Sequence, residues 1–148
     1  MASGDRDSFQ LASSHTTILY PSRGGELARI GPEEVRQRYG VDPNQVPDFI
    51  ALRGDPSDKL PGAAGVGPKR AAQLLRRYGT LDGILDAGLF ATQAETLRLY
   101  RLIATMDAKA PLPSLADQEP TWSSASDFAR NWGLNQLADR LDEKIRPP

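Results

Sequence analysis

Apolar residues recur at helical spacing along most of the chain, while residues 16–30 have the β-branched and alternating character of strands. The clearest helix is predicted over residues 68–79, where apolar positions follow i, i+3, i+4 and i+7: Ala71, Leu74, Leu75 and Tyr78. This spacing buries one stripe of the helix. The opposite side is then left to Gln73 and to basic residues, namely Lys69, Arg70, Arg76 and Arg77.

Other helices are predicted where proline or a capping residue precedes a periodic segment and glycine follows it. The predicted helices cover residues 32–39, 47–53, 80–87, 92–107, 126–132 and 134–145. TTILY (16–20) and ELARI (26–30) flank RGG and predict a small β-hairpin. Residues 108–121 hold three prolines and predict an extended connection. The expected fold class is therefore mainly α with one small β-hairpin.

Composition limits the chemistry that this chain of 148 residues can perform. Cysteine is absent and His15 is the single histidine, which excludes disulfide frameworks, thiolate metal clusters and histidine-rich zinc sites. Any bound metal must be held by oxygen. No apolar run approaches the roughly 20 residues that span a bilayer, and the start lacks the regions of a signal peptide. We therefore expect no membrane association and a cytoplasmic location.

Charge is distributed unevenly along the chain although the net charge is only -1. Six basic residues and two acidic residues lie between Arg53 and Tyr78, whereas acidic residues are in excess from Asp107 onward. A local basic patch on a nearly neutral protein suits a phosphate-binding surface. A solvated helix surface is the alternative interpretation of the same pattern.

The glycine pair Gly65 and Gly67 precedes the basic helix and resembles no complete nucleotide-binding loop. Pro68 separates Gly67 from Lys69, which a Walker loop does not allow, and a dinucleotide fingerprint needs glycine where Arg70 stands. What remains is a tight turn, Gly65-Val66-Gly67, at a helix N-terminus, where backbone N–H groups and the helix dipole favour an anion. Such a hairpin can hold a DNA backbone without reading bases. Alternatively, the glycines only permit a sharp turn.

Two pairs of carboxylates are candidate metal ligands, Asp55 with Asp58 and Asp5 with Asp7. Carboxylates about 4 Å apart repel by about 1 kcal/mol in water and about 4 kcal/mol near a protein surface, and a divalent cation reverses this cost. In an extended segment the side chains of Asp5 and Asp7 would share one face. Turn formation by the first pair and solvation of the chain start are the alternatives.

The motifs together resemble one family. SGDRDSFQL, TTILYP, ALRGDPSDKLPGAAGVGPKRAAQLL and RRYGTLDGIL are similar in sequence and order to the C-terminal half of the 5′ nuclease family, which includes flap endonucleases and the 5′ to 3′ exonuclease domain of bacterial DNA polymerase I. The resemblance implies Mg²⁺- or Mn²⁺-dependent hydrolysis of phosphodiester bonds in DNA replication and repair. The implied substrate is duplex DNA next to a 5′ flap, nick or RNA primer, and the implied location is at the nucleoid.

The resemblance also implies roles for individual residues. It makes Asp5, Asp7, Asp55 and Asp58 the ligands of the second metal site. It makes residues 60–78 a helix-hairpin-helix element whose DNA-binding residues are Gly65, Val66, Gly67, Lys69, Arg70, Arg76 and Arg77. In the family, a K⁺ ion can sit at this hairpin when DNA is bound, and carbonyls near Gly65 and Gly67 would coordinate it.

The expected organisation follows from the same resemblance. Residues 1–40 are expected to be the edge of a PIN-like α/β nuclease core with the β-hairpin, residues 41–90 the helix-hairpin-helix subdomain, and residues 91–148 a helical region. Family members carry further metal-binding carboxylates upstream, so we expect little or no nuclease activity from this chain alone. Apolar surface around Phe9, Leu11 and Ile18 would then be exposed. The alternative function is a catalytically inactive module that only binds DNA.

Overall fold

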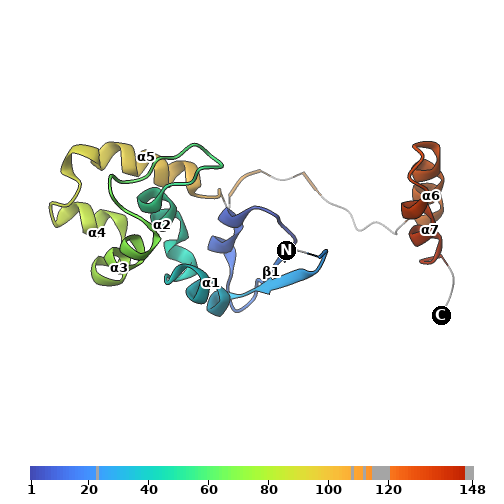
Figure 1. Ribbon diagram of the computed structural model, residues 1–148, viewed down its shortest axis with the longest axis horizontal. Coiled ribbons are helices and arrows are strands. Elements are labelled where there is room, and N and C mark those ends of the chain that lie inside the picture. The colour runs from blue at the N-terminus through green and yellow to red at the C-terminus, as the bar shows by residue number, and fades with distance from the viewer. Residues whose placement is uncertain (23, 108, 112, 115–120, 146–148) are drawn as a thin grey trace. The chain divides into compact units, whose positions relative to one another are not determined.

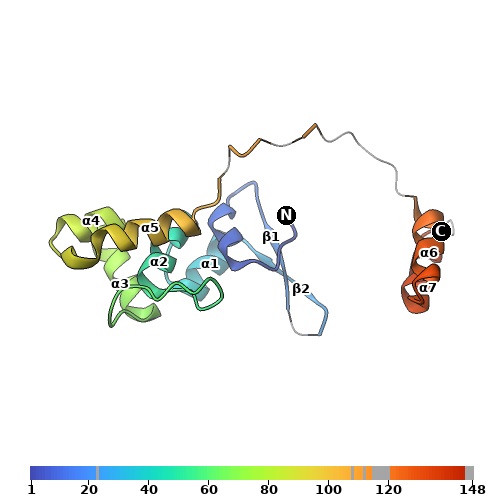
Figure 2. The same ribbon diagram turned by 90° about the horizontal axis from the view of Figure 1, so that it is seen from above.

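The computed structural model describes residues 1–22, 24–107, 109–111, 113–114 and 121–145. The chain divides into two compact units, Met1–Lys109 and Ala110–Pro148, and the boundaries expected near residues 40 and 90 both fall inside the first. The elements of the first unit follow in the order η1 (Arg6–Leu11), β1 (Ile18–Pro21), β2 (Leu27–Ile30), α1 (Pro32–Tyr39), η2 (Pro43–Gln45), α2 (Val46–Arg53), α3 (Pro68–Tyr78), α4 (Leu81–Asp86), η3 (Ala91–Gln93) and α5 (Ala94–Ala104). Figures 1 and 2 show them.

The predicted β-hairpin is present at the start of the first unit. β1 and β2 pair antiparallel, with Ile18 opposite Ile30 and Pro21 opposite Leu27. The chain start adds a parallel bridge from Ala2 to Leu19. The hairpin therefore ties the segment that precedes η1 to the rest of the unit.

Helix ends follow the proline and glycine signals of the sequence. Pro32 begins α1, and the Glu34 carboxylate accepts a hydrogen bond of 2.8 Å from Gly31 N, which satisfies a backbone donor at this end. Gly40, with φ +72°, ends α1 in the left-handed region. The Gln45 side chain in turn accepts from Asp42 N at 3.0 Å before α2 begins.

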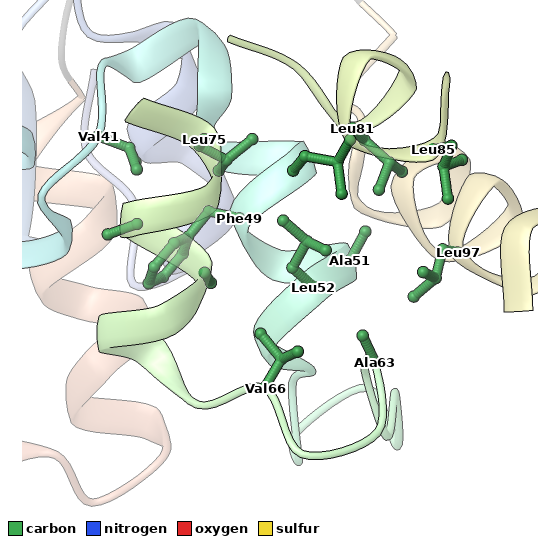
Figure 3. Packing of buried hydrophobic residues seen from close by; sticks show 13 residues of the cluster. Val41, Phe49, Ala51, Leu52, Ala63, Val66, Leu75, Leu81, Leu85 and Leu97 are labelled. Atoms are coloured by element: carbon green, nitrogen blue, oxygen red, sulfur yellow. The ribbon is translucent and has the colours of Figure 1, made fainter. Parts of the chain in front are cut away.

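Helix α2 is the centre of the first unit and contributes to two apolar clusters. One cluster includes Phe49, Ala51 and Leu52 and packs against α3, α4 and α5. Figure 3 shows Ala51 and Leu52 between Leu75 of α3 and Leu97 of α5, and Phe49 below Leu75. The second cluster joins Val46 and Ile50 to apolar residues of η1 and its C-cap, the hairpin, α1, the loop after α2 and the end of α5: Phe9, Ala12, Ile18, Ile30, Val35, Leu60 and Ala104.

The expectation of exposed apolar surface at the chain start is wrong. Phe9 is 1% exposed and Ile18 is 0% exposed, because both pack in the second cluster, and Leu11 is half-buried. Apart from Met1, the large exposed apolar residues described for the first unit lie on β2 and along α5: Leu27, Leu99, Leu102 and Ile103.

The second unit is a pair of helices, α6 (Trp122–Asn131) and α7 (Asn135–Asp142), joined through a turn at Gly133, which has φ +72°. Ser126 donates to the Ala138 carbonyl at 3.3 Å, and Arg130 pairs with Asp139 at 3.1 Å. The two predicted C-terminal helices are thus present. Most of the predicted connection over residues 108–121 lies outside the described residues. None of the described helices is long and apolar enough to cross a membrane.

Candidate functional site

The loop from Gly54 to Gly62 carries Asp55 and Asp58 and is closed at its base by backbone contacts. Asp55 and Leu60 form an isolated antiparallel bridge with hydrogen bonds of 2.8 Å in both directions. Gly54 and Gly62 have φ values of +84° and +74°, and a Cβ on Gly62 would lie 2.4 Å from Gly54 N. Only glycine fits such a close backbone approach, so these two glycines set the position of both aspartates.

Asp55 is buried and held by its neighbours. Its Oδ1 accepts hydrogen bonds from Ser57 N at 2.9 Å and from the Ser57 hydroxyl, and its Oδ2 accepts from Arg53 Nη2 at 3.3 Å. Burial alone would raise the pKa of Asp55. The bonds from Ser57 and the charge of Arg53 outweigh burial and hold this pKa below its ordinary value, so Asp55 is ionised at neutral pH.

Arg53 is itself fixed in place beside Asp55. Its guanidinium lies over the rings of Phe49 and Tyr39, at 5.3 and 5.8 Å from their centroids, and its Nε donates to the Gly54 carbonyl at 2.9 Å. Cation–π contacts of this kind contribute about 0.5–2 kcal/mol each. Arg53 therefore connects the aromatic core of the unit to the carboxylate of Asp55.

Asp5 and Asp7 lie at the start of η1. Asp5 caps this helix, because its Oδ1 accepts from Asp7 N at 2.9 Å and its carbonyl accepts from the Ser8 hydroxyl. The segment is not extended at Asp7, which lies in the first turn of the helix. Capping by Asp5 is the physical reason, since an aspartate side chain readily satisfies backbone donors two or three residues later.

The four aspartates nevertheless line one cleft of about 600 Å³, which we call the acidic cleft. Its other lining residues include Arg6, Tyr20 and Arg53. Burial, and then the charges of Asp5, Asp58 and Asp55, raise the pKa of Asp7 to about 6. Burial is the largest cause of this shift, and the charges of the other three aspartates add to it. On the same wall, Arg6 Nε donates to the Tyr20 hydroxyl at 3.2 Å.

The chemistry of this cleft suits a hard divalent cation, although its donors do not converge. Among the described residues, no three His, Cys, Asp or Glu side chains lie close enough together to hold a metal ion as a closed cage. Mg²⁺ commonly uses one or two carboxylates and keeps several waters, so an open cleft with four carboxylates fits it better than a cage would. A cation there would also reduce the repulsion that raises the pKa of Asp7.

The predicted glycine turn, Gly65-Val66-Gly67, lies between α3 and the loop that carries Asp55 and Asp58. Gly65 has φ +70° and therefore needs the freedom of glycine, whereas Gly67 has φ -90° and is the N-cap of α3 without a side-chain capping bond. The Val66 side chain is 6% exposed and packs in the core, as Figure 3 shows beside Ala63. Any contact of Val66 with a ligand is thus limited to its backbone.

The basic residues of α3 are exposed, as its periodicity predicts. Ala71 and Leu75 are buried and Leu74 and Tyr78 are half-buried, while Ala72 is an additional buried residue that the pattern missed. In the described part of the chain, no ion pair involves the four cations of this helix, Lys69, Arg70, Arg76 and Arg77. These unpaired charges beside a glycine turn form a surface suited to phosphates.

Sequence reasoning missed several residues of the acidic cleft. Arg6 lies between Asp5 and Asp7, and Ser57 lies between Asp55 and Asp58. Their position next to the paired aspartates in the sequence could have identified both as residues of the cleft. Tyr20 and the aromatic support of Arg53 had no such signal, because they come from the hairpin and from α1 and α2. Their roles depend on tertiary packing.

Comparisons with known proteins show which family and which fold this chain resembles. The model of the family described as 5′-3′ exonuclease, C-terminal SAM fold, matches residues 41–125, which is more than half of the chain. DNA polymerase I of Mycobacterium tuberculosis is 53% identical over 87 residues, which cover 58% of this chain and 10% of that protein. A 5′-3′ exonuclease of Streptomyces coelicolor is 34% identical over 161 residues, covering 95% of this chain and 54% of that protein.

A solved structure of T5 5′-exonuclease with divalent metal ions (zinc) bound has a TM-score of 0.59 and 20% identity, over 70% of this chain and 41% of that one. At this identity the likeness concerns the fold. The chain spans about a tenth of the DNA polymerase I relatives and about half of the Streptomyces exonuclease. On the family match and the shared fold, the chain belongs to the 5′-3′ exonuclease family, whose C-terminal SAM-fold region it contains.

Proposed function

We propose that this chain is the C-terminal portion of a 5′ to 3′ exonuclease or flap endonuclease, which binds duplex DNA and supplies aspartates of a Mg²⁺ or Mn²⁺ site for phosphodiester hydrolysis. The observation that supports this most directly is that Asp5, Asp7, Asp55 and Asp58 line one cleft although the two pairs lie far apart in the sequence. The activity is proposed for a whole protein that contains this segment.

Each residue of the cleft has a definable task in this proposal. Asp55 is kept ionised and oriented by Ser57 and Arg53, while Asp7 and Asp58 present further carboxylates and Asp5 keeps Oδ2 free of the capping bond. A bound divalent cation would stabilise negative charge on the scissile phosphate and lower the pKa of a bound water. Arg53 limits the repulsion among the carboxylates before any cation arrives.

DNA holding is assigned to the glycine turn and α3. The first turn of α3 has no side-chain cap, and its helix dipole favours an anion there. Lys69 and Arg70 oppose that dipole in the free protein, and a backbone phosphate removes the conflict. Carbonyls near Gly65 and Gly67 are the candidate ligands of a K⁺ ion when DNA is bound. The proposed substrate is duplex DNA next to a 5′ flap, nick or RNA primer, and the proposed location is the nucleoid.

Salt dependence of binding tests the DNA-holding part of the proposal. Fluorescence anisotropy with a labelled 20-base-pair duplex, measured in EDTA over a range of NaCl concentrations, should give a log-log slope of roughly -3 to -4 if about four phosphates are neutralised. Arg70→Gln should weaken binding and reduce the slope by about 0.9. A flat salt response by the unmodified chain would contradict DNA holding.

Cleavage tests the other part. In the protein that contains this segment, Asp58→Asn should abolish cleavage of a 5′-flap DNA in Mg²⁺ while leaving duplex affinity in EDTA unchanged. Asp86→Asn is the matched control, because Asp86 is exposed on α4 and lies outside the acidic cleft. Equal cleavage by wild type and Asp58→Asn would favour the alternative, a module that only binds DNA.

A further inference from the structure

A second cleft, of about 340 Å³, lies between the end of α1 and the first turns of α3. Three of the residues that line it carry positive charge, namely Arg38, Lys69 and Arg76, and none carries negative charge. It shares no lining residue with the acidic cleft. Arg38 belongs to α1 and was not among the DNA-binding residues that the sequence predicts.

The cleft exists because α1 ends directly against α3. Gly40, the left-handed residue that ends α1, packs so closely that a Cβ there would lie 3.3 Å from Ala72 Cβ and 3.7 Å from Arg76 Nη2. On α3, Lys69 and Arg76 are separated by two helical turns and so lie on one face. This contact brings Arg38 beside that face.

The three cations make no ion pair within the described part of the chain, although the charge of Arg38 helps to lower the pKa of Glu34. No ion pair there includes Arg38, Lys69 or Arg76, and all three side chains are exposed. Arg36, half a turn earlier on α1, differs: it pairs with Glu33 at 3.1 Å and with Asp42 at 2.6 Å. The chain thus neutralises one arginine of α1 and leaves the other unpaired in a cleft with two more cations.

An anion is the ligand that this arrangement favours, because it relieves repulsion among three like charges while each cation stays accessible to water. Arg70 and Arg77 do not line the cleft, so the cations of α3 fall into two groups, of which only one faces α1. We propose that the α1–α3 cleft binds a phosphodiester group of a DNA backbone and that Arg38 extends the DNA-binding surface from α3 onto α1. The inference rests on the proposed function of duplex binding.

The test compares Arg38→Gln with Arg29→Gln, a matched control on the exposed face of β2, by anisotropy with a labelled 20-base-pair duplex in EDTA. Arg38→Gln should weaken binding about fivefold at 50 mM NaCl and reduce the log-log salt slope by about 0.9, because one phosphate contact is lost. Arg38→Lys, which keeps the charge, should restore most of both values. Because Arg38 is exposed and unpaired, none of these changes should affect folding, which circular dichroism checks.

The outcomes separate this inference from the function on which it rests. If the unmodified chain fails to bind duplex, the proposed function fails and the inference with it. If the chain binds but Arg38→Gln and Arg29→Gln have equal affinity and slope, the inference alone is wrong. Binding of inorganic phosphate that depends on Arg38, together with duplex binding that does not, would assign the cleft to free phosphate and overturn the inference.

Discussion

Replacing Asp7 by asparagine should stabilise the first unit at neutral pH when no divalent cation is present. The Asp7 side chain makes no hydrogen bond or ion pair with the described residues, and burial beside three other aspartates raises its pKa to about 6. An aspartate in the unfolded chain has a pKa of about 3.9. Between these values the folded state keeps a proton that the unfolded state has lost, so the free energy of unfolding falls as pH rises from about 4 to 6.

The pKa difference sets the size of the effect. A shift of about two pKa units corresponds to about 3 kcal/mol, and solvent screening of this partly exposed group reduces that to about 1–1.5 kcal/mol. Asparagine cannot ionise and avoids the cost. The advantage of Asp7→Asn in free energy of unfolding should therefore be near zero below pH 4 and about 1–1.5 kcal/mol at pH 7.

Urea unfolding in EDTA measures this difference. The two units need separate signals: all four tyrosines lie in the first unit, and both tryptophans lie in the second. The tyrosine ring resonances in NMR spectra, which differ from those of tryptophan, therefore follow the unit that contains Asp7. A lower stability of Asp7→Asn than of wild type at pH 7, or an advantage that does not change between pH 4 and pH 7, would refute the electrostatic reasoning.

Three further predictions concern the frame of the site. Gly62→Ala should lower the free energy of unfolding in urea by more than about 3 kcal/mol, because its Cβ would meet backbone at 2.4 Å. Gly65→Ala, which has a similar φ but open space around its Cβ, should lower it by about 1–2 kcal/mol. Equal losses would contradict the close approach at Gly62. Arg53→Met should raise the pKa of Asp55 in an NMR titration, and an unchanged pKa would exclude their pairing. Leu97→Ala should lower the free energy of unfolding in urea by about 2–5 kcal/mol, and a loss below about 1 kcal/mol would contradict the burial of Leu97.

Local signals in the sequence predicted much of the fold. Pro32 and Pro68 begin helices, Gly40 and Gly79 end them, and the apolar spacing of residues 68–79 predicts which side of α3 is buried. These signals act over one or two turns, so they are readable without knowledge of the tertiary structure. The hairpin between residues 16 and 30 was predicted from local signals of the same kind, and the pairing of β1 with β2 confirms it.

Features that depend on packing could not be predicted in this way. Phe9 and Ile18 were expected to be exposed, yet both are buried because η1 and the hairpin pack on α2. The burial of Asp48 was not predicted either: its carboxylate accepts a hydrogen bond from Leu81 N at 2.9 Å, at the start of α4. Such a partner, 33 residues away, leaves no trace in the local pattern.

The candidate site was predictable to a similar degree. The paired aspartates could be identified by their spacing and by the family resemblance, whereas the support of Asp55 by Arg53 depends on the rings of Tyr39 and Phe49. Arg38 was missed because its role depends on where α1 ends against α3. In each case the missing information was which elements lie side by side.

Binding of Mn²⁺ to the chain tests the central claim most directly, and the electron paramagnetic resonance signal of free Mn²⁺ measures it. The four aspartates of the acidic cleft should bind Mn²⁺ in wild type and in the control Asp86→Asn, with binding weakened at least about tenfold in Asp58→Asn. Failure of the wild-type chain to bind Mn²⁺ at millimolar concentration, or equal binding by Asp58→Asn, would contradict the assignment of this cleft as a divalent cation site.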